Sequence, residues 1–121
     1  MAIKSYRDLT VWQAGVDLVE SVYCLTGKFP KNEIYALSSQ VQRAAVSVPS
    51  NIAEGHARVS RKEFLHFLSI SLGSLAELET QLILAQRLNY LTREEVDGAL
   101  SKTDELGRMI RGLQKSLQAK E

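Results

Sequence analysis

The sequence has 121 residues with 15 Lys and Arg against 14 Asp and Glu, which gives a formal net charge of +1. This length fits one domain, taken here as 1–121, and 45% hydrophobic with 24% charged residues excludes a disordered tail. With two prolines and no turn signal repeated every ten residues or so, a β-sandwich or barrel is excluded and an all-α fold is expected.

The first predicted helix covers residues 10–28. A T-x-x-Q capping box from Thr10 to Gln13 indicates its start, and Gly27 and Pro30 indicate its end. Apolar residues recur at helical spacing along two neighbouring seams, so we expect two sides of this helix to be buried. The first seam is Val11, Gly15, Leu18, Val22, Leu25 and Phe29, and the second is Trp12, Val16, Val19 and Tyr23.

The second predicted helix covers residues 31–58 and contains Pro49. Proline has no N–H to donate and its ring crowds the preceding turn, so the sequence predicts a kink at this residue. The alternative is a true break near Ser47, followed by a short second helix. Because the apolar phase continues across Pro49, one bent helix is favoured. The inward positions are predicted to be Ile34, Leu37, Val41, Ala44, Ala45, Val48 and Ile52.

The third predicted helix covers residues 61–88, after an S-x-x-E capping box at Ser60 and before Asn89, a residue that tolerates a left-handed stop. Its main stripe is Phe64, Leu68, Ser71, Leu75, Leu78, Leu82 and Ala85. Small residues form a second strip, Ser69, Gly73, Ala76 and Thr80. This strip either contacts another copy of the chain or lies beneath a neighbouring helix of the same copy.

The fourth predicted helix covers residues 93–118 and follows a capping box that starts at Thr92. Its stripe is Val96, Ala99, Thr103, Leu106, Ile110, Leu113 and Leu117. Short connections make successive helices antiparallel, so the expected fold is an up-down-up-down four-helix bundle. The apolar surface exceeds what one four-helix core needs, and we therefore expect self-association.

Known enzyme and metal motifs are missing from the sequence. Glu63 and His66 form one E-x-x-H, whereas a di-iron bundle needs two such motifs and further inward glutamates. Cys24 has no histidine near it in the sequence, and no phosphate-binding or hydrolase glycine motif occurs. We therefore expect no enzyme activity, no catalytic residues, no metal and no cofactor.

Cellular location is predicted from what the sequence lacks. It shows no apolar leader, one Cys and no uninterrupted 18-residue apolar run. A cytoplasmic location without membrane contact is expected.

Polar residues gather on one face of the second helix. Around Arg43 lie Asn51, Glu54 and Arg58, beside the predicted kink. This face is either simply solvated or a recognition or subunit-contact surface. In the third helix, Glu79 falls inside the apolar arc, so its carboxylate needs a partner such as an arginine.

Basic residues cluster in two places, although the chain as a whole is nearly neutral. One cluster is Arg58, Arg61 and Lys62, and the other is Arg108, Arg111 and Lys115 in the fourth helix. Such clusters bind phosphate by displacing condensed counterions, or they merely keep the surface soluble.

Several segments together resemble the bacterial 23S ribosomal RNA intervening-sequence protein family. They are Leu9–Ala14, Phe29–Leu37, Gln40–Ala45, the P-S-N-I-A-E-G stretch at 49–55 and E-L-E-T-Q at 77–81, within residues 6–91. Ala36 stands where the family usually has Gly. The family's fold is similar to the accessory variability determinant of diversity-generating retroelements, a homopentamer that binds nucleic acid and works with a reverse transcriptase. The resemblance therefore implies a pentamer and an RNA or DNA partner.

The leading hypothesis is a non-enzymatic homo-oligomeric bundle that binds structured RNA, such as ribosomal RNA, or a nucleic-acid enzyme such as a reverse transcriptase. Its predicted nucleic-acid-binding residues are Arg43, Arg58, Arg61, Lys62, Arg108, Arg111 and Lys115. Predicted structural or interface residues are Pro49, Asn51, Glu54, Gly73 and Glu79. The alternative is a protein-interaction scaffold whose charges only solubilise it.

Overall fold

The computed structural model describes residues 5–119, in which four α-helices and two short 3-10 helices are formed without any strand. The α-helices are α1 (Thr10–Thr26), α2 (Leu37–His56), α3 (Arg61–Arg87) and α4 (Arg93–Ala119). The 3-10 helices are η1 (Tyr6–Asp8) and η2 (Lys31–Glu33). The prediction of an all-α four-helix bundle is confirmed.

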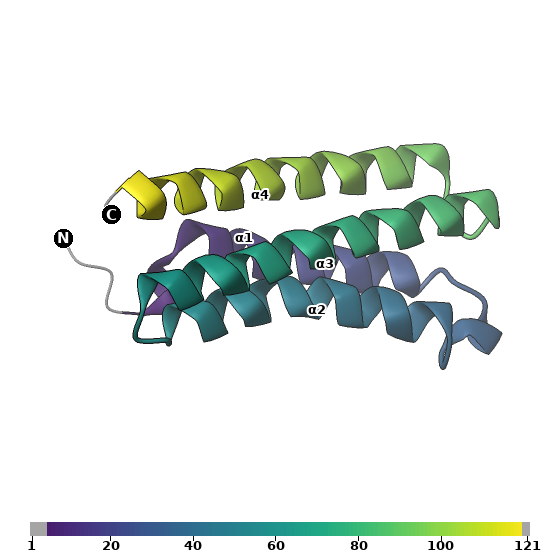
Figure 1. Cartoon of the computed structure of the whole chain (residues 1–121). Coiled ribbons are helices and arrows are strands. Elements are labelled where there is room, and N and C mark those ends of the chain that lie inside the picture. The colour runs from purple at the N-terminus through teal and green to yellow at the C-terminus, as the bar shows by residue number, and fades with distance from the viewer. Residues whose placement is uncertain (1–4, 120–121) are drawn as a thin grey trace.

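The four α-helices lie side by side, and each packs against two others. Both α1 and α3 contact α2 and α4. Successive helices run in opposite directions, with the α2–α3 turn at one end of the bundle and the other two connections at the opposite end (Figure 1). Two contacts show that α1 and α2 are antiparallel. Gly15 near the start of α1 lies against Pro49 in the later part of α2, and the Thr26 hydroxyl at the end of α1 accepts a hydrogen bond from Gln42 in the earlier part of α2.

The predicted apolar stripes supply the core. In α4, Val96, Ala99, Thr103, Leu106 and Ile110 are all buried. In α3 the buried members of the stripe are Leu68, Ser71, Leu75, Leu78, Leu82 and Ala85, joined by Ser74 and Gln81 from outside it, and in α1 the buried set includes Val11, Leu18 and Val22. Helical spacing alone therefore identified the inward face of these three helices, whereas the second seam predicted for α1 is only half-buried and its Tyr23 is exposed.

The predicted start of the second helix is wrong. Residues 31–33 form the separate helix η2, the chain turns at Ala36, and α2 begins only at Leu37. Ile34, predicted to point inward, is 53% exposed. The Glu33 carboxylate accepts hydrogen bonds from the Leu37 backbone N–H at 3.2 Å and from the Tyr90 hydroxyl at 2.6 Å. Glu33 thus fastens the connection to both α2 and the α3–α4 loop.

Two of the three predicted capping boxes are present. The Ser60 hydroxyl accepts from the Glu63 N–H, and the Thr92 hydroxyl accepts from the Glu95 N–H, both at 3.1 Å. The box at Thr10 is wrong, because the cap residue of α1 is Leu9 and makes no side-chain bond. Gln13 instead donates to the Arg7 carbonyl at 2.9 Å. Asn89 has a φ of 65°, as expected of a left-handed stop after α3.

Pro49 lies inside α2, which is continuous from Leu37 to His56, so the alternative of a broken helix is wrong. The kink stays a prediction. Side chains supply hydrogen bonds around the proline: Asn51 donates to the Ser47 carbonyl at 2.8 Å, and Ser71 of α3 donates to the Val48 carbonyl at 2.9 Å. The bond from Ser71 ties the region of Pro49 to α3.

The outer face of α3 is apolar and uncovered. All four members of the small-residue strip, Ser69, Gly73, Ala76 and Thr80, are exposed, so they do not lie beneath a neighbouring helix of the same copy. Ile70, Ile83, Leu84 and Leu88 on the same helix are 38–45% exposed. By length and composition alone α3 could cross a membrane, a test that the core helix of a soluble protein also passes. In this bundle it packs between α2 and α4.

Candidate nucleic-acid interface

The first predicted basic cluster lies at the α2–α3 turn, where only two of its three side chains are free. The Arg58 guanidinium pairs with Glu54 at 2.8 Å and with Glu63 at 3.9 Å, and it lies 4.9 Å from the centre of the Phe67 ring. The Glu54 and Arg58 spacing of four residues on a helix is the signal that predicts this pair. Arg61 and Lys62 are exposed and have no ion pair among residues 5–119.

The second cluster lies beside a polar hollow of about 330 Å³ between α3 and α4. Arg108 and Arg111 line it together with two acidic residues, Glu79 and Asp104. No carboxylate comes within ion-pair distance of either arginine in the part of the chain that the structure describes. Both guanidinium groups are therefore available to an anion, although the two acidic neighbours reduce the local positive potential.

Glu79 has a different partner from the one that the sequence suggested. The Thr103 hydroxyl donates a hydrogen bond to its carboxylate at 2.5 Å. The carboxylate has a partner, as expected, but no arginine pairs with it in residues 5–119. A threonine on the inner stripe of α4 thus meets the need of this carboxylate for a donor.

Lys115 lies toward the same end of the bundle as the α2–α3 turn. Gln114, its neighbour in α4, donates to the Ser69 hydroxyl in the first half of α3 at 3.1 Å. Since α3 and α4 are antiparallel, residues after 114 lie beside the start of α3 (Figure 1). The free cations Arg61, Lys62, Arg111 and Lys115 thus belong to one half of the α3–α4 side.

Arg43 is separated from these cations. It lines a hollow of about 320 Å³ between α2 and α3 with Gln40, Ser47 and Glu77. The polar face of α2 is partly a packing surface, because the hydroxyl groups of Ser47 and Ser74 are 2.8 Å apart and Asn51 donates to Ser47. Asn51 is thus bonded within α2, whereas Arg43 is exposed.

The groups with shifted pKa values lie at the opposite end of the bundle. The Lys28 ammonium and the Thr92 backbone N–H bond to Glu95 and lower the pKa of its carboxyl. The hydrogen bond to Glu33 raises the pKa of the Tyr90 hydroxyl. Within residues 5–119 no three His, Cys, Asp or Glu side chains form a group that could hold a metal ion. The exposed Arg and Lys side chains can bind anions.

Comparison with known proteins adds a family and a fold. A family model described as 23S rRNA-intervening sequence protein matches residues 7–112. No curated protein matches the chain. Among solved structures, a protein of unknown function from the S23 ribosomal protein family of Bacteroides thetaiotaomicron is similar, with a TM-score of 0.81 and 24% identity over 88% of this chain and 99% of that one.

Proposed function

We propose that this chain, which belongs to the 23S rRNA-intervening sequence protein family, is a non-enzymatic, self-associating bundle that binds structured RNA through the cations of its α3–α4 side. The family's function is unknown, and its name links it to intervening sequences of ribosomal RNA. Ribosomal RNA is accordingly the first RNA to test. The proposed location is the cytoplasm, where such RNA is found.

The observation that carries the RNA proposal is the presence of exposed cations without carboxylate partners. Of the seven predicted residues, only Arg58 has an ion pair in the described part of the chain. Unpaired Arg and Lys side chains are able to replace the counterions of a phosphate backbone. One copy offers few of them, so several copies are needed to build an extended basic surface.

The observation that supports self-association is the presence of two apolar strips that one copy leaves uncovered. One is the outer face of α3, with Ile70, Ile83 and Leu84 beside the small-residue strip. The other follows α1 and α2, where Tyr23 is 48% and Val46 is 38% exposed beside the half-buried Val16 and Val19. Burial of such strips against other copies is favourable. Two different strips favour a ring, in which unlike faces meet, over a two-fold dimer.

Titration of a labelled RNA hairpin from a ribosomal RNA intervening sequence tests the first part. We expect binding that weakens steeply between ~50 mM and ~200 mM salt. The double variant Arg61→Ala/Lys62→Ala should bind the RNA more weakly. The slope of log binding constant against log salt concentration should become less steep by about 2 for each copy that contacts the RNA. Lys31→Ala/Arg93→Ala removes the same charge at the opposite end of the bundle and should change neither value.

Light scattering at micromolar concentration tests the second part. The expected mass is about five times that of the 13.5 kDa chain, and Ile70→Ser/Leu84→Ser should lower it. A monomer at that concentration contradicts the proposal. An oligomer that does not bind RNA at low salt supports the alternative function, a protein-interaction scaffold.

A further inference from the structure

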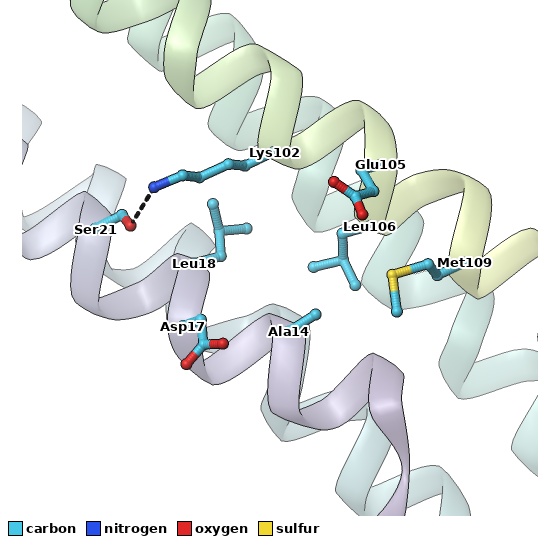
Figure 2. Close-up of a pocket in the computed structure, with 8 residues that line it drawn as sticks. All are labelled: Ala14, Asp17, Leu18, Ser21, Lys102, Glu105, Leu106 and Met109. Atoms are coloured by element: carbon cyan, nitrogen blue, oxygen red, sulfur yellow. Dashed lines mark hydrogen bonds between the residues drawn. The ribbon is translucent and has the colours of Figure 1, made fainter.

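A groove runs along the seam between α1 and α4, on a side of the bundle that the proposed RNA contacts do not use. Its first hollow, of about 220 Å³, has an apolar floor of Ala14, Leu18, Leu106 and Met109 (Figure 2). A second hollow of about 360 Å³ follows, lined by Cys24, Leu25, Gly98 and Ala99 among others. Ser21 and Lys102 line both hollows, so the two lie next to each other along the seam.

The rim of this groove carries more carboxylates than ammonium groups. Asp17 on α1 and Glu105 on α4 stand on opposite sides of the first hollow (Figure 2), and Glu94 lines the second. All three are exposed and have no ion pair in residues 5–119. The Lys102 ammonium reaches across the groove to donate to the Ser21 hydroxyl at 2.8 Å, and it offsets only one of these three negative charges. An apolar floor between acidic rims suits a ligand that is apolar and cationic.

Gly98 is a second, independent observation. A Cβ atom at this position would meet no heavy atom within 4 Å, so the packing of the bundle does not require glycine here. Glycine is nevertheless a poor residue for the interior of a helix such as α4. A glycine on the wall of a groove allows another backbone to approach closely.

The size of the groove indicates the class of ligand. From Ala14 to Leu25 it follows three turns of α1, ~16 Å at 1.5 Å per residue. The first hollow is smaller than most small-molecule sites, which measure about 300–1,000 Å³, and the second only just exceeds the lower limit. Two linked hollows along a helix pair instead match the spaced apolar side chains of an amphipathic helix.

We propose that the α1–α4 groove binds a basic amphipathic helix of a partner protein. Its apolar side chains would occupy the two hollows, and its Lys or Arg side chains would pair with Asp17, Glu94 and Glu105. The backbone of the bound helix would pass close to Gly98. The hydrogen bond between Lys102 and Ser21 crosses the groove, so the Lys102 side chain has to move away when the helix binds.

Fluorescence anisotropy with a labelled synthetic helix of leucine and lysine tests this proposal on the full-length protein. We expect saturable binding, and no binding of a leucine and glutamate helix of the same pattern. Gly98→Gln should weaken binding at least tenfold while raising the thermal midpoint, since it adds a side chain to the wall and removes a helix-interior glycine. Asp17→Asn/Glu105→Gln should weaken binding several-fold, whereas Glu20→Gln/Glu77→Gln, with the same charge change elsewhere, should not.

Two results would overturn the proposal. The first is peptide binding that is unchanged in both Gly98→Gln and Asp17→Asn/Glu105→Gln. The second is loss of the oligomer in Gly98→Gln, which would assign the groove to a second copy. RNA titration of the same variants separates this proposal from the proposed function, because RNA binding should be unaffected by them.

Discussion

The backbone of Gly55 in α2 lies directly against Phe67 in α3. A Cβ atom at position 55 would stand 2.6 Å from the Phe67 Cβ and 3.0 Å from the Phe64 Cδ1. Because a Cβ atom cannot rotate away, Gly55→Ala forces α2 and α3 apart at their turn. We expect the free energy of unfolding to fall by about 1–3 kcal/mol, the usual cost of overpacking. Urea denaturation measures this free energy of unfolding. An unchanged free energy would show that α2 and α3 can move apart at this turn without cost.

Gly73 gives the opposite expectation on the outer face of α3. A Cβ atom there would meet nothing within 4 Å, so within one copy Gly73→Ala only improves helix propensity, by about 0.5–1 kcal/mol. If another copy packs closely on this face, the same change weakens the assembly. Denaturation at two protein concentrations distinguishes the cases. If Gly73→Ala raises the free energy of unfolding equally at both concentrations, the small-residue strip is not covered by another copy.

The hydrogen bond from Thr103 to Glu79 joins α4 to α3 and is expected to stabilise the bundle. Thr103 is 1% exposed, so Thr103→Val keeps the shape of the core while removing the donor to the carboxylate. A hydrogen bond to a charged group accounts for about 1.5–3 kcal/mol of unfolding free energy. Thr80→Val removes an exposed hydroxyl bonded only to Ala76 and should cost less than about 0.5 kcal/mol. Equal losses in the two variants would contradict a specific role for the Thr103 bond.

Periodicity predicted the core well because burial is a property of whole helix faces. The residues that are buried in α4, from Val96 to Ile110, follow the stripe with the single exception of Gly107. The same reasoning failed at Ile34, whose spacing to Leu37 and Val41 is helical although the chain turns between them. The turn depends on the Glu33 side chain and its bonds to Leu37 and Tyr90, and Tyr90 is 57 residues away in the sequence.

The candidate site was less predictable, because a charge count does not tell which charges pair. Arg58 belonged to the predicted basic cluster, but Glu54 and Glu63 neutralise it. Arg108 and Arg111 were predicted as a stripe, whereas their acidic neighbour Glu79 comes from another helix. The α1–α4 groove had no signal in the sequence, since its walls combine residues of the first and last helices.

Acid should weaken the bundle partly through Glu95, which bonds to Lys28 and to the Thr92 backbone and so connects the end of α1 to the start of α4. These donors lower the pKa of Glu95 from its ordinary 4.5. A carboxyl whose pKa is lower in the folded state stabilises that state above pH 4.5, and the stabilisation disappears as the pH falls through the folded-state pKa. Glu95→Gln should therefore lower the thermal midpoint at pH 7 and show a smaller further loss on acidification.

The neighbouring Glu94 provides the matched control for this prediction. It is exposed and has no ion pair in the described part of the chain, so Glu94→Gln makes the same charge change without removing the contact to Lys28. Its midpoint should follow that of the unmodified protein from neutral pH down to below pH 4. If the two variants have the same thermal midpoint over this whole pH range, the bond between Lys28 and Glu95 does not contribute to stability. The acid sensitivity would then come from other carboxyl groups of the bundle.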